Sequence, residues 1–315
     1  MIKINKPKFW DKKNLSFFAV LLYPLSLIVI FVVNLKKLFS KEIDFKIPII
    51  CVGNIYIGGT GKTPTSIILA KELVGKGMRP VILRKYYKNH IDEINQIKNT
   101  FNHLIINKNR IDGINEAINK NYDTVILDDG LQDYKVKKNL NIVCFNQNQL
   151  IGNGLVIPSG PLRENLSILK KVHVVLINGV KDLDFENKIL RINKNLDIYY
   201  CHYQPENIEK FRNDKLLVLA GIANPENFLS LLKKNNLNIK EKLFFPDHYT
   251  FTKKEIKNII DHAKQKKLKV IMTEKDYFKL KDFDLDNYDY LKVNLEISNK
   301  EELFKKILDI YVKKN

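Results

Sequence analysis

The amino-acid sequence predicts an α/β protein in which a mostly parallel sheet carries helices on both faces. Two observations predict this class. Short, continuous apolar runs alternate with segments of helical periodicity, as expected for parallel strands joined by helices. A glycine-rich loop, GNIYIGGTGKT (53–63), lies between the first of these runs and the next helical segment. At 315 residues, the chain is long enough for one large core or two smaller ones.

The chain carries a large excess of positive charge. Lysine and arginine number 53 against 35 acidic residues, which gives a net charge of +18. Such a surplus suggests an anionic partner, such as phospholipid headgroups or a phosphorylated substrate. Compositional drift toward lysine could produce the same surplus without a partner. No nucleic-acid-binding motif is recognisable, so we expect no nucleic-acid partner.

The longest apolar segment is LSFFAVLLYPLSLIVIFVV (15–33), which contains no charged residue. As a helix it would be about 28 Å long, close to the thickness of a bilayer's hydrocarbon core. Three interpretations are open: a membrane-spanning helix, a partly inserted helix, or a buried core helix. Pro24 would kink a helix, and lysines flank both ends, which favours a helix–turn–helix wedge at an anionic membrane surface. Residues 1–40 are therefore predicted to form a membrane-associated N-terminal helix.

The remaining elements follow in order, with a domain boundary expected near residue 205. A first α/β core is predicted for residues 41–205 and a smaller C-terminal α/β subdomain for 206–315. In the first core, strands are predicted at 47–54, 79–84, 102–107, 122–130, 140–146 and 172–179, and helices at 63–77, with Gly75 and Gly77 as stop signals, and at 110–121. At 196–205 the sequence pattern changes to that of short, aromatic-rich strands. In the subdomain, strands are predicted at 215–222, 240–249 and 269–276, and helices at 224–235, 252–266 and 299–313.

The glycine-rich loop resembles a phosphate-binding loop with one departure. Its end matches G-x-x-x-x-G-K-[ST], but Tyr56 stands where that signature has its first glycine. In this interpretation Lys62 reaches the β- and γ-phosphates of a nucleotide and the Thr63 hydroxyl ligates Mg²⁺. An ordinary glycine turn is the alternative, and the strand before the loop and the helix after it argue against that. The predicted nucleotide-binding residues of the loop are Tyr56, Ile57, Gly58, Gly59, Thr60, Gly61, Lys62 and Thr63.

Two aspartates end the predicted strand at 122–130. Asp128 and Asp129 occupy the position at which phosphate-loop proteins carry an acidic residue for Mg²⁺. Adjacent strand residues point to opposite sides, so one aspartate can serve the metal while the other serves the chemistry or the loop. Gln132 could contact phosphate or an attacking group. The alternative is a solvated turn at the end of the strand, which would explain the Asp-Asp-Gly sequence equally well if it is taken by itself.

Six motifs in order give the chain a family resemblance: VGNIYIGGTGKTP, ILDDGLQDYK, GNGLVIPSGPLRE (152–164), LAGIANPENF (219–228), FPDHYTF (245–251) and MTEKD (272–276). From about residue 8 to the end, the chain resembles the tetraacyldisaccharide 4′-kinases, whose phosphate loop has the same unusual spacing. The resemblance implies a P-loop kinase core in residues 41–205. It implies transfer of the ATP γ-phosphate, with Mg²⁺, to the 4′-hydroxyl of the lipid A disaccharide precursor. It also implies action at the cytoplasmic face of the inner membrane, with no obligate protein partner.

The resemblance also implies roles for individual residues. HIDEIN matches the family's Gly-Asp-Glu-Pro motif, which makes Asp92 the catalytic base, with Glu93 beside it at the substrate. FPDHYTF supplies His248, which would orient or relay the proton. Asp128 and Asp129 would serve Mg²⁺ and the transferring phosphoryl group, with Thr63 and Asp128 as metal ligands. Arg84 and Arg163 are expected at the substrate.

The segment LRKYYK (83–88) departs from the family's Ser-Arg-Gly-Tyr-Gly stretch, because Lys85 and Tyr87 replace glycines. Two other functions stay open, the second of them because of these changes. One is a membrane-associated P-loop ATPase or switch protein with a protein partner. The other is a binding protein that keeps the nucleotide loop and has lost the acceptor site.

Overall fold

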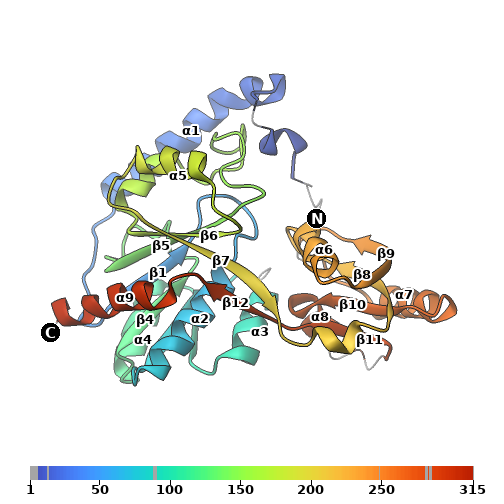
Figure 1. Cartoon of the computed structure of the whole chain (residues 1–315). Helices are drawn as coiled ribbons and strands as arrows, with labels where there is room; N and C mark the ends of the chain where they lie inside the picture. The colour runs from blue at the N-terminus through green and yellow to red at the C-terminus, as the bar shows by residue number, and fades with distance from the viewer. Residues whose placement is uncertain are drawn as a thin grey trace. The chain divides into compact units, whose positions relative to one another are not determined.

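The computed structural model divides the chain into two compact units (Figure 1). We call them the loop unit, which comprises Ile4–Tyr86, Phe101–His202 and Ile297–Asn315, and the C-terminal unit, which comprises mainly Tyr87–Thr100 and Tyr203–Glu296. The structure describes residues 6–12, 14–87, 91–247, 249–280, 283 and 286–314.

This division groups the segments of the chain differently from the division expected from the sequence. The longest segment of the C-terminal unit begins near the expected boundary, between His202 and Tyr203. However, residues 87–100 belong to the C-terminal unit and residues 297–315 belong to the loop unit. The crossing between His202 and Tyr203 lies within β7 (Asp197–Pro205), and the chain returns to the loop unit at the last residue of β12 (Val293–Ile297). Residues 15–33 do not form a separate unit.

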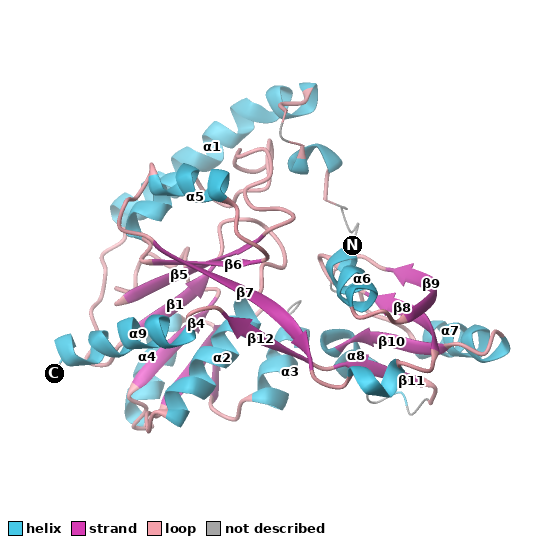
Figure 2. Ribbon diagram, viewed as in Figure 1, coloured by secondary structure: helices cyan, strands magenta, loops and turns pink. Residues whose placement is uncertain are grey.

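The loop unit is built on a parallel sheet, which Figure 2 shows with its strands in magenta. Along the sheet the strands run in the order β7-β6-β5-β1-β4-β2-β3, and each neighbouring pair is parallel. The central strands are buried along their whole length, which explains their unbroken apolar sequences. Besides β7, the strands are β1 (Ile49–Gly53), β2 (Pro80–Lys85), β3 (Leu104–Asn107), β4 (Thr124–Asp128), β5 (Leu140–Asn146) and β6 (Val174–Asn178).

Helices cover both faces of this sheet because the connections run in opposite directions. The connection from β1 to β2 passes through α2 (Lys62–Gly75), and that from β3 to β4 passes back through α4 (Arg110–Asn119). Right-handed crossovers in opposite directions lie on opposite faces. The helix α5 (Leu183–Leu190) follows β6 and shares the core cluster of α4, and α9 (Lys300–Lys314) ends the chain. The predicted fold class is confirmed by this arrangement.

The apolar N-terminal segment forms one helix, α1 (Phe17–Phe39), after a short 3₁₀ helix at Lys8–Asp11. Ser16 caps it by accepting a hydrogen bond from the Ala19 N–H. The predicted helix–turn–helix wedge is therefore wrong. Pro24 lies inside the helix, and the loss of one backbone donor is tolerated within 23 residues. The core-helix interpretation also fails, because only Ala19 and Ser26 of the 23 residues in α1 are buried.

The C-terminal unit has its own parallel sheet, in the order β11-β10-β8-β9. Alternate residues of β8 face two separate cores: Leu216 and Val218 face the side of α6, and Leu217 and Leu219 face the side of α7. The elements are α3 (Ile91–Thr100), η3 (Ile208–Phe211), β8 (Lys215–Ala220), α6 (Pro225–Lys234), β9 (Asn238–Phe244), α7 (Lys253–Gln265), β10 (Lys269–Thr273), α8 (Glu274–Leu280) and β11 (Tyr288–Leu291).

Candidate active site

The glycine-rich loop lies between the carboxyl end of β1 and the first turn of α2. Two of its glycines adopt backbone angles that side chains rarely permit: Gly58 has φ of 116° and Gly61 has φ of 91°. Gly61 directly precedes α2, whose first residues, Lys62 and Thr63, are buried. The loop therefore turns at Gly58 and Gly61 and presents its last residues at a helix N-terminus, where anions are favoured.

Tyr56 replaces the usual first glycine because this part of the loop is extended. The Ile57 N–H donates to the Pro161 carbonyl at 2.9 Å, and the Arg163 N–H donates to the Ile55 carbonyl at 2.8 Å. The segment around Tyr56 is thus held like a strand against residues 161–163, and no left-handed residue is needed there. Its buried ring hydroxyl donates to Asp11 at 2.5 Å.

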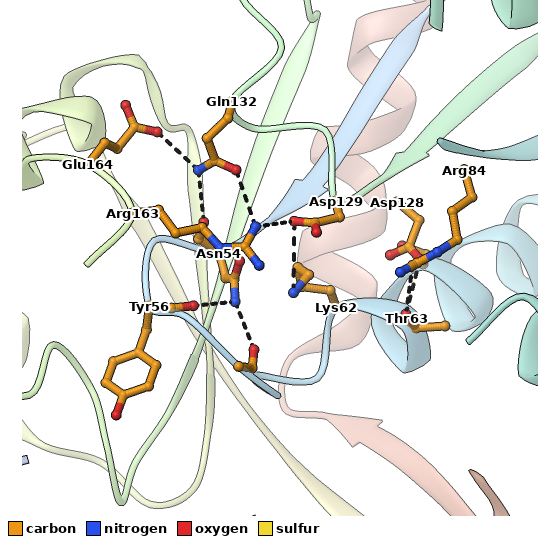
Figure 3. Close-up of polar contacts among 12 residues, drawn as sticks. Asn54, Tyr56, Lys62, Thr63, Arg84, Asp128, Asp129, Gln132, Arg163 and Glu164 are labelled. Atoms are coloured by element: carbon orange, nitrogen blue, oxygen red, sulfur yellow. Dashed lines mark hydrogen bonds and ion pairs between the residues drawn. The ribbon is translucent and has the colours of Figure 1, made fainter. Parts of the chain in front are cut away.

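The first acidic cluster surrounds Asp128, at the end of β4 and beside β1 (Figure 3). The Thr63 hydroxyl donates to Asp128 Oδ2 at 3.0 Å, and the Ser66 hydroxyl donates to Oδ1 at 3.1 Å. The Arg84 guanidinium forms a salt bridge with the same carboxylate, and Asp128 is fully buried. The sequence assigns Arg84 to the substrate, whereas the structure puts it 3% exposed, against Asp128 and Thr63.

The second acidic cluster surrounds Asp129. Its carboxylate lies 3.8 Å from the Lys62 ammonium and 2.8 Å from the Arg163 guanidinium. Burial acts to raise the pKa of Asp129, but the charges of Lys62, Arg163 and Arg84 outweigh it and lower the pKa below its usual value. Asp129 therefore stays ionised and holds two cations beside the loop.

The two aspartates diverge for a reason that differs from the sequence argument. Strand alternation was the basis of that argument, but β4 ends at Asp128. Asp129 has φ of 60°, a left-handed conformation that aspartate tolerates better than most residues. Its N–H donates to the Val52 carbonyl of β1 at 2.9 Å. A turn after the strand therefore directs one carboxylate to Thr63 and the other to Lys62.

Gln132 and Arg163 connect the second cluster to buried groups that the sequence did not identify. Figure 3 shows Arg163 between Gln132 and Asp129. The Gln132 amide donates to the Asn54 carbonyl at 3.1 Å and to Glu164 at 3.0 Å. The Asn54 amide in turn donates to loop carbonyls, those of Tyr56 and Gly58. Glu164 belongs to the quoted GNGLVIPSGPLRE motif, which was a signal that could have found it.

A salt bridge connects Glu164 to the apolar helix. Glu164 is 1% exposed, and its carboxylate accepts a hydrogen bond from the Tyr134 hydroxyl at 2.9 Å. The ammonium of Lys37, in the last turn of α1, lies 2.7 Å from the same carboxylate. The end of α1 is thereby joined to the residues around the loop.

The other predicted site residues belong to the C-terminal unit. Asp92 and Glu93 lie in α3, and the Pro-Asp-His motif follows β9. The side chain of Asp92 and the whole of His248 lie outside the described residues. The structure thus brings Lys62, Thr63, Asp128, Asp129, Gln132 and Arg163 together within the loop unit.

The loop and the Asp128 cluster fit a nucleotide phosphate and a hard cation. Thr60 and Asn54 each carry a buried side-chain oxygen for which the described residues offer no hydrogen-bond partner. Thr63 and Asp128 provide adjacent oxygen donors, and Mg²⁺ is usually held by one or two carboxylates together with substrate phosphates. A parallel sheet with this loop after β1 and this acidic pair after the neighbouring strand defines the class of P-loop nucleotide-binding proteins.

Comparison with known proteins assigns the chain to a family within that class. The sequence model of the tetraacyldisaccharide-1-P 4′-kinase (LpxK) family matches residues 18–312. The chain belongs to this family, which favours the kinase interpretation over the ATPase or switch alternative.

Individual relatives match over nearly their whole length. The chain is 42% identical to the tetraacyldisaccharide 4′-kinase of Pelagibacter ubique over 312 residues, covering 98% of this chain and 99% of that protein. It is 33% identical to that of Rickettsia akari over 324 residues, covering 98% of each. Among solved structures, LpxK from Aquifex aeolicus in complex with ATP is 22% identical, with a TM-score of 0.71 over 93% of this chain and 99% of that one.

Proposed function

We propose that this protein transfers the γ-phosphate of ATP to the 4′-hydroxyl of the lipid A precursor tetraacyldisaccharide 1-phosphate. Family membership over residues 18–312 supports the reaction class. The observation that carries the proposal is the pairing of Lys62 with Asp129 and of Thr63 with Asp128, at the start of one helix. Phosphoryl transfer depends mainly on positioning and charge neutralisation, and this arrangement supplies both.

The loop unit provides the nucleotide-binding groups in this proposal. The N–H groups of residues 58–63 and the Lys62 ammonium bind the phosphates. Thr63 and Asp128 would hold Mg²⁺, which supplies charge neutralisation on the phosphate oxygens when it is bound. Arg163, at 25% side-chain exposure, is the cation of the Asp129 cluster that is more open to solvent, and we assign it to the substrate. Asp129 and Gln132 hold Arg163 in place.

The base is proposed on the motif resemblance. Asp92 accepts the proton of the attacking hydroxyl, and His248 orients or relays, while Glu93 contributes to substrate binding. A base in this role is worth about 10²–10⁴-fold in rate.

The proposed activity predicts a specific product. Purified protein in detergent, with Mg·ATP and tetraacyldisaccharide 1-phosphate, should form a product with one more phosphate, detected by mass spectrometry. ATP turnover should depend on the lipid acceptor, because the acceptor hydroxyl is the nucleophile. The Pelagibacter ubique relative serves as the positive control. Failure to form product under conditions in which that relative is active would overturn the proposal, and acceptor-independent ATP turnover would favour an ATPase.

We also propose that α1 attaches the protein to an anionic membrane, at the cytoplasmic face of the inner membrane where the acceptor lipid would be available. Within the described chain, α1 is long and apolar enough to cross a bilayer. Only 11% of its most apolar 18-residue stretch is buried. Residues 1–41 contain eight lysines and one acidic residue, Asp11. An exposed apolar helix flanked by lysines binds by apolar burial together with attraction to anionic lipid.

Membrane attachment through α1 can be tested with vesicles. Leu21 and Ile28 are 62% and 59% exposed and two turns apart on α1. Replacing both with aspartate should lower binding to phosphatidylglycerol-containing vesicles at least about tenfold, since each apolar side chain contributes about 1.5–3 kcal/mol on burial. The control is Leu183→Asp, an exposed apolar residue on α5. Equal vesicle binding by the double variant and the control would refute attachment through α1.

A further inference from the structure

Three of the quoted sequence motifs meet at one edge of the C-terminal sheet. LAGIANPENF (219–228) begins in the end of β8, FPDHYTF (245–251) follows β9, and MTEKD (272–276) spans the end of β10 and the start of α8. These strands are parallel neighbours, so their carboxyl ends lie at the same edge. The proposed reaction uses only His248 from these motifs, which leaves the others without a role.

Asp276 of the last motif fixes the start of α8 to the end of β8. Its fully buried carboxylate accepts from the Gly221 N–H at 2.9 Å and from the Thr273 hydroxyl at 2.8 Å. The Lys279 ammonium donates to the same carboxylate at 3.0 Å. A buried carboxylate with three donors, one of them a cation, is well satisfied, so α8 begins at a rigid point of the sheet edge.

The loop that contains the Pro-Asp-His motif is fixed on both sides of residue 248. The Phe245 N–H donates to the Ala220 carbonyl at 2.8 Å. The rings of Phe245, Tyr249 and Phe251 pack together, with centroids 4.8–5.0 Å apart. Aromatic contacts of this kind add stability beyond the area they bury. The residues on either side of position 248 therefore have a defined path, and a side chain that contacts them can influence their position.

Lys275 provides such a contact. Its ammonium lies 3.2 Å from Asp247 Oδ1, the carboxylate of the residue that precedes His248 in the chain. Lys275 is 15% exposed and Asp247 is 29% exposed, so the pair is shielded more than a surface ion pair. Lys275 belongs to α8, which also packs against α3, the helix that includes Asp92. One short helix thus contacts both segments from which the base and its histidine are assigned.

We propose that Lys275 is a positioning residue for phosphoryl transfer, an inference that rests on the proposed function. Its ammonium holds the Asp247 carboxylate, and α8 supports the chain segments that carry His248 and Asp92. Asp276 gives α8 its fixed starting point. Lys275 acts through Asp247 and does not itself contact the reacting atoms.

Replacing Lys275 tests this role by separating kcat from KM. Lys275→Met should lower kcat about 10²-fold, because misplacement by about 1 Å can cost that much. The KM for ATP should change less than threefold, since the nucleotide-binding residues belong to the loop unit. Lys275→Arg, which keeps the charge, should restore kcat to within about fivefold of the original protein. Initial rates at varied ATP and acceptor concentrations provide these values.

Lys264→Met is the matched control, because Lys264 forms an exposed ion pair with Asp286 in the same unit. It should leave kcat unchanged. If Lys275→Met folds poorly, Asp247→Asn offers a second test, and the double variant should be no slower than the slower single variant. Unchanged kcat in both single variants, additive losses in the double variant, or no rescue by arginine would overturn the inference. Product formation by the original protein would leave the proposed function intact in each case.

Discussion

Replacing Lys62 with methionine should lower kcat/KM for ATP by about 10²–10³-fold, the effect expected when one donor to a developing negative charge is removed. Lys62 is the first residue of α2, is 8% exposed, and lies 3.8 Å from Asp129. Methionine preserves the length and apolar volume of the side chain but removes the ammonium. Steady-state rates at saturating acceptor, and calorimetric titration with Mg·ATP, would measure the loss in turnover and in binding.

The control for Lys62 lies on the same helix. Lys71 of α2 is exposed, so Lys71→Met removes one positive charge at a distance from the loop and should leave kcat/KM within about twofold. The Lys62 variant should also raise the pKa of Asp129, because Lys62 is the largest of the charges that lower it. If Lys62→Met and Lys71→Met have equal kcat/KM, the loop does not bind the transferred phosphate.

The parallel sheet could be predicted because its signal is local. Strands buried on both faces are continuous apolar runs, and the prediction of 140–146 coincides with β5 (Leu140–Asn146). The compact unit to which an element belongs is not determined by its local sequence. Helical periodicity predicts a helix at 299–313 but does not specify the sheet on which it packs. In the structure Tyr311 of α9 is hydrogen-bonded to Thr124 of β4, which binds the last helix to the first core.

The residues of the candidate site also divide into those that local sequence predicts and those that depend on distant contacts. Lys62, Thr63 and the two aspartates could be found because phosphate and metal chemistry requires those residue types at that spacing. A motif marks Glu164, but no role could be assigned to it or to Asn54. Their roles arise from hydrogen bonds that Gln132 donates across 32 and 78 positions of sequence. Nor does the sequence reveal why Tyr56 is tolerated, since that depends on pairing between residues 55–57 and 161–163.

The largest effect on stability is expected at Arg84. Its guanidinium is the cation of the Asp128 cluster, and both side chains are almost fully buried. Arg84→Met would leave the Asp128 carboxylate buried without that partner, at a cost of about 3–5 kcal/mol in the free energy of unfolding. Urea unfolding would measure the loss as a lower midpoint. The exposed pair of Lys120 with Glu116 is the control, and Lys120→Met should leave the urea midpoint almost unchanged.

A double variant separates the structural role of Asp128 from its proposed metal role. Arg84→Met with Asp128→Asn removes both charges, and the asparagine can still accept a hydrogen bond from Thr63 or Ser66. Replacing both charged partners should recover most of the lost stability, because no uncompensated charge stays buried. Activity should not recover, because a neutral amide is a poor ligand for Mg²⁺. Recovery of activity together with stability would mean that Asp128 serves only to pair with Arg84, and another residue would have to hold the metal.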